Sequence, residues 1–99
     1  MADDKIVLAL YVAGSTLRSE RAIANIHRIL SDFLDANCEV RIIDVLEDPE
    51  SAETARVMAT PTLVRETPAP ERRIIGDLSD TKAVLRSLDL PGKTDNEKR

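Results

Sequence analysis

The sequence of 99 residues predicts a single α/β domain with the element order βαβαββα, a mixed four-stranded sheet with flanking helices. Three observations carry this prediction. Residues 5–12 form a near-continuous apolar run, which is typical of a central strand covered on both faces. Residues 17–35 place apolar side chains at steps of three and four, as an amphipathic helix does. Pro61 opens another apolar run directly after a helical segment, and proline is tolerated as the first residue of a strand.

In the first half of the chain, two predicted strands flank the long helix. Gly14 breaks the first strand, and Ser15 or Thr16 can cap the helix that follows. A second strand is expected over residues 39–46. Because a long helix joins the two strands, they should pair in parallel through a right-handed crossover.

The second half of the chain predicts a short helix and a β-hairpin. Asp48 is a good N-cap and Pro49 suits the first helical position, so a helix should begin there and end near Met58. Residues 61–66 and 71–76 predict two antiparallel strands joined by a proline-containing turn.

A last helix completes the order. Ser79 can cap it, and Val84 and Leu88 are spaced to share its inner face. The complete order is that of a thioredoxin-like domain. In that setting Pro61 is either an ordinary trans proline that ends a helix or a cis proline that fixes a bend, and the order of elements favours the cis form.

Composition limits the classes of function. The net charge of −4, from 14 basic and 18 acidic residues, argues against a nucleic-acid-binding protein. No apolar run reaches transmembrane length, and the acidic start is not that of a signal peptide. We therefore expect one domain over residues 1–92, a flexible polar tail over residues 93–99, and a cytoplasmic protein without a nucleic-acid or membrane partner.

The chemistry of thioredoxin-like enzymes is missing from this sequence. That chemistry needs a thiol of low pKa at a helix N-terminus, and residues 13–17 contain no sulfur. The single cysteine, Cys38, lies at the far end of the first helix and should be a small, partly buried apolar residue. The single histidine, His27, should be partly exposed on that helix. We expect no catalytic residue, no metal site and no cofactor, and hence no enzyme.

Arginine side chains are the most informative polar feature. Arg56, Arg65, Arg72 and Arg73 fall in the second half of an acidic chain. Since adjacent strand residues point to opposite faces, at most one of the last two can pack toward the sheet interior. The arginines form either a solvated face with local ion pairs or a docking surface for an acidic protein partner.

Four strings stand out between residues 5 and 90. They are Leu-Tyr-Val-Ala-Gly at 10–14, Ile-Asp-Val-Leu at 43–46, Ala-Thr-Pro-Thr-Leu at 59–63 and Arg-Arg-Ile-Ile-Gly-Asp-Leu-Ser at 72–79. Together they resemble the KaiB family of circadian-clock proteins, and the last string is the most specific. The resemblance implies a non-catalytic protein that binds the ring of a KaiC-like RecA-fold ATPase and modulates its phosphorylation or ATPase cycle.

The resemblance also implies two folds. One is the thioredoxin-like monomer, βαβαββα, which binds KaiC; the other is a ground state, βαββααβ, a homo-tetramer or dimer with a rearranged second half. Such fold switching needs two packings within a few kcal/mol of each other. The alternative function is a thioredoxin-like sensory input domain that acts on a signalling kinase. A thiol oxidoreductase is disfavoured because Cys-x-x-Cys is absent.

Particular residues receive roles from the resemblance. Arg21, Arg56, Arg65 and Arg73 match positions linked to partner contact or assembly, and Arg41 matches a position on the edge that KaiA uses. The candidate partner-binding residues are Arg21, Arg41, Arg56, Arg65, Arg72 and Arg73. The residues expected to define the fold are Gly14, Pro61, Gly76, Asp77, Ser87 and Asp89.

The sequence departs from the family pattern in three places. Pro68-Ala69-Pro70 replaces a run of three prolines, Ser87 stands where glycine is common, and no long acidic tail is present. These differences favour a KaiC-like ATPase in a timer or stress-response system as the partner, and we do not expect a KaiA-type partner.

Ser87 generates a prediction about the balance between the two folds. Residues 80–90 are a helix in the thioredoxin-like form and largely a strand in the other. Serine costs a helix roughly 0.5 kcal/mol less than glycine. We therefore expect the thioredoxin-like form to dominate, and Ser87→Gly to shift the population ratio about twofold toward the alternative. Backbone NMR shifts of residues 80–90 measure this ratio, and strand-like shifts in the unmodified protein would contradict the prediction.

Overall fold

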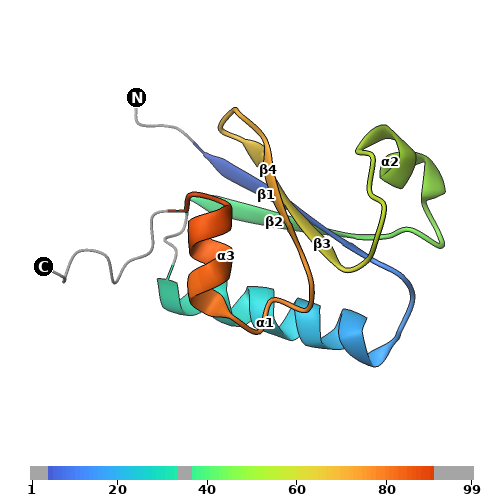
Figure 1. The fold of residues 1–99 in the computed structure, drawn as a ribbon, viewed down its shortest axis with the longest axis horizontal. Coiled ribbons are helices and arrows are strands. Elements are labelled where there is room, and N and C mark those ends of the chain that lie inside the picture. Colours follow the sequence, from blue (N-terminus) through green and yellow to red (C-terminus); the bar gives the residue numbers. More distant parts are fainter. Residues whose placement is uncertain (1–4, 34–36, 91–99) are drawn as a thin grey trace, which may run out of the picture.

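Three helices and four strands follow one another in the predicted order βαβαββα (Figure 1). The computed structural model describes residues 5–33 and 37–90. Within them the elements are β1 (Ile6–Val12), α1 (Leu17–Phe33), β2 (Cys38–Asp44), α2 (Pro49–Thr54), β3 (Thr62–Thr67), β4 (Arg72–Ile75) and α3 (Thr81–Ser87). The expected tail over residues 93–99 lies outside the described residues.

The four strands form one mixed sheet in the order β2-β1-β3-β4. The strand β1 pairs in parallel with β2, as the crossover through α1 requires, and antiparallel with β3, which in turn pairs antiparallel with β4. The register between β1 and β3 shifts after Val7: Leu8 lies opposite Arg65, whereas Val7 lies opposite Thr67. This bulge leaves Glu66 without a residue opposite it on β1.

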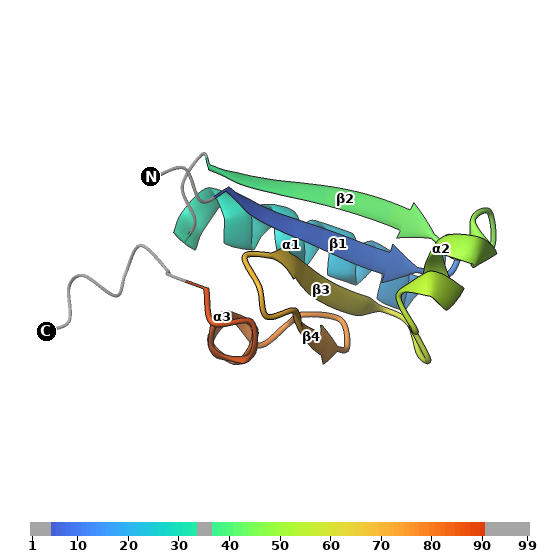
Figure 2. The same ribbon diagram turned by 90° about the horizontal axis from the view of Figure 1, so that it is seen from above.

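The two faces of the sheet are covered unequally (Figure 2). The long helix α1 and the helix α3 cover one face, where Leu8 and Leu10 of β1 pack with Ile26 and Ile29 of α1 at 0% exposure. The short helix α2 covers only one end of the other face, above a smaller cluster that contains Ala9, Tyr11 and Val64. Part of this second face is therefore left open beside α2.

The turn from β1 into α1 is held by one carboxylate. Asp44 Oδ1, at the end of β2, accepts the backbone N–H groups of Gly14 and Leu46, each at 3.0 Å. Gly14 has a φ of +68°, and a Cβ there would lie 3.2 Å from Leu46 Cδ1, so glycine suits both the conformation and the space. Of the two predicted caps for α1, Thr16 performs the role, because its Oγ1 accepts the N–H of Ser19 at 3.1 Å.

Two predicted boundaries in the middle of the chain are wrong. The strand β2 ends at Asp44 instead of residue 46, because the Asp44 side chain binds Leu46 N–H and turns the chain. The helix α2 ends at Thr54 instead of near Met58, because Arg56 takes a left-handed φ of 58°. The start of α2 is as predicted: Asp48 caps it by accepting the N–H of Ser51 at 3.2 Å.

The predicted cap of the last helix is also wrong. Asp80 caps α3 by accepting the N–H of Ala83 at 3.1 Å, whereas Ser79 donates its own N–H to Asp77 Oδ1 at 3.1 Å. The carboxylate of Asp80 reaches the first turn, so it replaces the hydroxyl one residue earlier. The strands of the hairpin differ from the predicted bounds by one residue: β3 begins at Thr62 and β4 at Arg72.

The proline that opens the second half is buried. The Thr60–Pro61 peptide bond is cis, which confirms the favoured alternative. The carbonyl of Pro61 accepts the N–H of Gly76 at 2.9 Å, so the residue before β3 is tied to the residue after β4. Gly76 has a φ of +133°, a conformation that other residues rarely adopt.

The cap of α3 generates a prediction about stability. Asp80→Ala should lower the free energy of unfolding by about 1 kcal/mol, because the first turn of α3 loses a capping acceptor. Ser79→Ala is the matched control and should have a smaller effect, since this exposed side chain does not cap the helix. Urea denaturation of both variants measures the difference, and a larger loss in Ser79→Ala would restore serine as the cap.

Candidate functional site

The place where thioredoxin-like enzymes carry a thiol is occupied by hydrogen-bonded backbone. After β1, the N–H of Ala13 donates to Ser19 Oγ at 3.3 Å, and that of Gly14 donates to Asp44. Cys38 is paired with Ile6, at the other end of β1, and is half-buried against the main core, as predicted. His27 is exposed on α1. The thiol is therefore a full strand length away from the helix N-terminus that would activate it.

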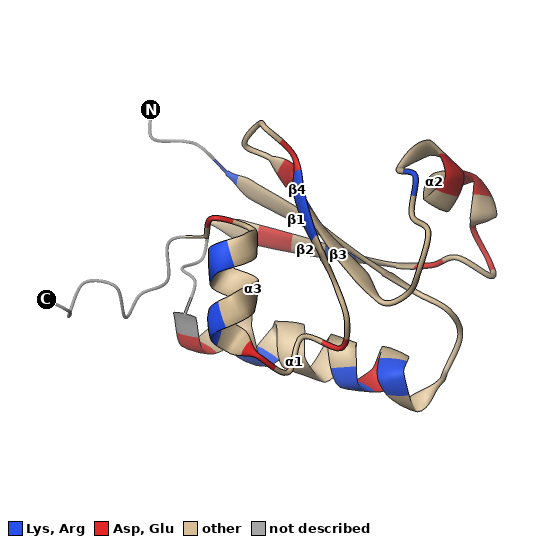
Figure 3. Ribbon diagram, in the orientation of Figure 1, with Lys and Arg blue, Asp and Glu red and all other residues tan. Residues whose placement is uncertain are grey.

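The six candidate arginines do not form one site (Figure 3). Arg41 lies on the edge strand β2, and Arg72 and Arg73 lie on β4 at the opposite edge of the sheet. Arg21 is exposed on α1, in the helical layer beneath the sheet, and Arg65 lies inside the protein. Arg56, which follows α2, is the one other candidate close to Arg72 and Arg73, since its carbonyl accepts a hydrogen bond from Arg73.

Arg73 ties β4 to the end of α2. Its guanidinium donates to the carbonyl of Ala55 at 2.8 Å and to that of Arg56 at 3.1 Å, and it forms an ion pair with Glu71 at 2.8 Å. The last turn of α2 has no basic residue of its own. Arg73 therefore supplies the positive charge that favours a helix C-terminus, from a strand distant in sequence. Arg72, its neighbour, is exposed, so one of the two packs inward, as predicted.

Exposed apolar side chains accompany these arginines. Met58 follows α2 and is 90% exposed, and Ile75 ends β4 and is 59% exposed. We group them with the exposed Arg56 and Arg72 as the α2–β4 surface, a set of side chains along the β4 edge of the sheet in which Arg72 and Ile75 project to opposite faces. Sequence reasoning found the arginines but not the two apolar residues. The sequence pattern placed Met58 near the end of a longer helix and Ile75 inside a strand, and it gave no sign that either is exposed.

Arg65 is only 4% exposed. Its guanidinium donates to the carbonyl of Pro70 at 2.7 Å and to that of Asp89 at 3.3 Å, while its Nε has no hydrogen-bond partner. Arg65 thus joins the hairpin turn to the residue after α3, where Asp89 adopts a φ of 54°. In this fold its charge is used internally and is not presented to a partner.

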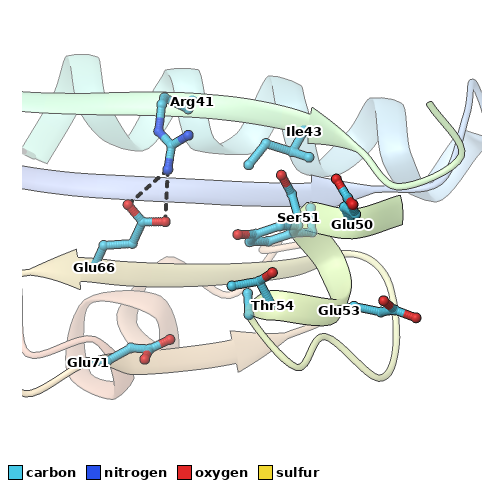
Figure 4. Close-up of a pocket in the computed structure, with 10 residues that line it drawn as sticks. Arg41, Ile43, Glu50, Ser51, Glu53, Thr54, Glu66 and Glu71 are labelled. Carbon is cyan, nitrogen blue, oxygen red and sulfur yellow. Dashed lines mark hydrogen bonds and ion pairs between the residues drawn. The ribbon is translucent and has the colours of Figure 1, made fainter. Parts of the chain in front are cut away.

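Arg41 is held by an ion pair that crosses β1. Its guanidinium contacts both carboxylate oxygens of Glu66 at 2.9 Å (Figure 4). Ala9 pairs with Arg41 on one side and with Val64 on the other, and its small side chain leaves room for the two long ones to meet above β1. The bulge that frees Glu66 from strand pairing lets it take part.

An open acidic groove lies between this ion pair and α2. Its volume is about 790 Å³, and its lining residues are Tyr11, Arg41, Ile43, Glu50, Ser51, Glu53, Thr54, Ala55, Glu66 and Glu71 (Figure 4). Burial raises the pKa of Tyr11 above its ordinary value, and the negative charge of Glu66 adds to the rise. None of the glutamates was singled out from the sequence as a site residue. The spacing of Glu50 and Glu53 on one helix was the available signal.

The loop before α3 is organised by Asp77. The hydroxyl and the N–H of Ser79 donate to its carboxylate and hold its pKa below the ordinary value, and the charge of Arg21 acts in the same direction. The carbonyl of Asp77 accepts the side-chain amide of Asn25, on α1, at 2.8 Å. Ser87 is exposed at the end of α3. Arg21 therefore lies beside this loop, away from the α2–β4 surface.

These features define a thioredoxin-like domain that lacks the activated thiol and carries exposed arginine and apolar side chains at one sheet edge. A family model for the KaiB domain matches residues 9–90. The chain is 51% identical over 87 residues to the circadian clock protein KaiB3 of Synechocystis sp., which covers 88% of this chain and 85% of the relative. It is 48% identical over 84 residues to the circadian clock oscillator protein KaiB of Prochlorococcus marinus, a match that covers 85% of this chain and 74% of the relative. The chain belongs to the KaiB family of circadian clock proteins.

Solved structures agree on the fold. The N-terminal domain of SasA from Synechococcus elongatus is similar with a TM-score of 0.71 and 24% identity, over 87% of this chain and 83% of that one. Mitochondrial thioredoxin 3 from Saccharomyces cerevisiae is similar with a TM-score of 0.70 and 17% identity, over 88% of this chain and 79% of that one. At these identities the likeness concerns the fold alone. Across residues 5–33 and 37–90, no helix has the length and apolar character needed to cross a bilayer.

The electrostatics around Tyr11 generate a prediction. Glu66→Gln should lower the pKa of Tyr11, because it removes a negative neighbour and leaves Arg41 unpaired, whereas Arg41→Met should raise it. Tyrosinate absorbance measures this pKa directly, since Tyr11 is the only tyrosine. Glu20→Gln, on α1, is the control and should change nothing.

The same shift fixes the sign of a pH effect on stability. The pKa of Tyr11 is raised in the folded protein, so its contribution to the free energy of unfolding is complete below the ordinary value of 10.0 and is lost as pH rises through the raised pKa. An unchanged pKa in both Glu66→Gln and Arg41→Met would contradict this account of the groove.

Proposed function

We propose that this protein is a non-catalytic regulator that docks on the ring of a KaiC-like RecA-fold ATPase and modulates its phosphorylation or ATPase cycle. The observation that carries the proposal is the α2–β4 surface, which holds two exposed arginines and two exposed apolar side chains along the β4 edge of the sheet. Arginine and methionine are enriched in protein interfaces, and acidic residues are depleted there. Membership of the KaiB family supports a partner from a circadian or related timing system.

The architecture favours protein binding over catalysis. The position of the usual thiol has no sulfur, and its backbone donors are already used by Ser19 and Asp44. The α2–β4 surface, by contrast, is built on a strand and a helix end that Arg73 fixes together. A preformed surface of this kind pays little ordering entropy when a partner binds. A role as an input domain of a signalling kinase is supported only by a likeness of fold.

Within this proposal the thioredoxin-like monomer is the binding form. The α2–β4 surface belongs to the half of the chain that is rearranged in the second fold of the family, so a switch would remove it. Arg65 supports the binding form by holding the hairpin turn and the end of α3 together. Arg41 is outside the proposed surface because it lies at the other edge and is paired with Glu66, so no KaiA-type partner is proposed. A cytoplasmic location fits an acidic chain with a single cysteine.

Charge reversal on the α2–β4 surface tests the proposal. Arg72→Glu should weaken binding to a purified KaiC-like ATPase from the same organism by roughly tenfold, and it should reduce the salt dependence of that binding. Arg72 is preferable to Arg73 because it is exposed and makes no hydrogen bond or ion pair with any described residue, so its loss should leave the structure intact.

Lys82→Glu is the matched control, since it makes the same change of charge on an exposed face of α3. Size-exclusion chromatography and fluorescence anisotropy measure the complex. Equal affinities for the unmodified protein, Arg72→Glu and Lys82→Glu would reject the α2–β4 surface as the docking site.

A further inference from the structure

The four glutamates of the acidic groove fall into two pairs with different partners. Glu66 is held by Arg41 at 2.9 Å and Glu71 by Arg73 at 2.8 Å. The carboxylates of Glu50 and Glu53 form no ion pair or hydrogen bond with any described residue. These two lie three residues apart on α2, where side chains are neighbours and like charges repel. One wall of the groove therefore carries uncompensated negative charge (Figure 4).

Tyr11 is an independent sign that the groove takes a ligand. The residue is 3% exposed and lines the groove, yet its hydroxyl makes no hydrogen bond with any described residue. Among the described residues, Arg65 Nε is the only fully buried side-chain nitrogen or oxygen without a partner, so the Tyr11 hydroxyl keeps access to the groove and can bond to a ligand there. A phenol can accept a hydrogen bond from an N–H donor, and its ring attracts cations. Tyr11 on one side and Glu50 and Glu53 on the other therefore favour the same kind of ligand, a cation that carries hydrogen-bond donors.

The arrangement separates organic cations from metal ions. Within the described residues, no three side chains of His, Cys, Asp or Glu are placed so that they could hold a metal ion together. The carboxylates are instead spread along a groove of about 790 Å³, a size that suits an extended group. An ammonium or guanidinium group has several donors at fixed spacing and can satisfy a carboxylate and a phenol at once.

We propose that the acidic groove binds an alkylammonium or guanidinium group. In this site Glu50 and Glu53 supply the negative charge, and the Tyr11 hydroxyl accepts a hydrogen bond. The Arg41–Glu66 ion pair forms the opposite wall and fixes the width of the groove. The cation is either a free polyamine or a basic side chain that another protein presents, since both offer the same chemistry.

The protein carries its own reporter for this site. Tyr11 is the only tyrosine and the chain has no tryptophan, so ultraviolet fluorescence reports on the groove alone. We would titrate the full-length protein with spermidine in one arm and with the blocked tripeptide acetyl-Gly-Arg-Gly-amide in the other. A saturable change of fluorescence is expected with at least one probe. Tighter binding of the tripeptide identifies a presented side chain as the source, and tighter binding of spermidine identifies a free polyamine.

Variants separate a built site from general attraction to an acidic protein. The double variant Glu50→Gln/Glu53→Gln should weaken binding of the better probe by roughly tenfold, because two uncompensated charges are lost. Glu20→Gln/Asp32→Asn removes the same charge from exposed positions on α1, across the sheet, and should bind as the unmodified protein does. Tyr11→Phe, followed by calorimetry, should weaken binding about threefold by loss of the acceptor. Absence of any spectral change with both probes, or equal weakening in the two double variants, would overturn the proposal.

Discussion

Burial of β1 on both faces is the constraint on which the other elements depend. Its residues from Leu8 to Leu10 are fully buried, so each face of the strand has to be covered by something apolar. The long amphipathic helix α1 meets this need on one side, and α2 meets it for part of the other. The strands β2 and β3 then complete the hydrogen bonding of β1 from its two edges. Because both faces of β1 are covered and both its edges are paired, side chains that can reach a partner or ligand lie mainly on the surrounding elements.

The unequal cover of the two faces explains where polar chemistry collects. The face beneath α1 and α3 is a continuous apolar core. The other face has only a six-residue helix above it, and the remainder carries long charged side chains whose aliphatic parts cover the sheet. Arg41 and Glu66 meet above Ala9, and Arg73 reaches from β4 to the carbonyls that end α2. The acidic groove results from a helix too short to cover this face.

The sequence was a good guide wherever the cause of a feature is local or periodic. The apolar run of β1, the helical spacing of α1 and the Asp48-Pro49 start of α2 all have such causes, and all were predicted. The end of α2 was missed because Arg56 adopts a left-handed conformation and the helix end is bound by Arg73, which is distant in sequence.

The candidate site was less predictable for the same reason. Arg65 and Arg72 are the same residue type and lie opposite each other on neighbouring strands, yet Arg65 on the inner strand β3 is buried and Arg72 on the edge strand β4 is exposed. The sequence could show that a cluster of arginines existed, but not which of them reach solvent. The groove depends on three strands and α2 meeting, and no single stretch of sequence contains that information.

The buried guanidinium of Arg65 has a consequence for how this half of the molecule comes apart. One side chain provides donors to two carbonyls, at Pro70 and Asp89, that belong to segments far apart in the sequence. When the hairpin turn or the end of α3 detaches, the buried guanidinium loses one of its carbonyl acceptors. Burial of the charge then becomes less favourable than its exposure to water. The second segment then loses its donor as well. Hairpin turn and helix end therefore detach as one cooperative unit, while the β1–α1–β2 half can keep its own hydrogen bonds.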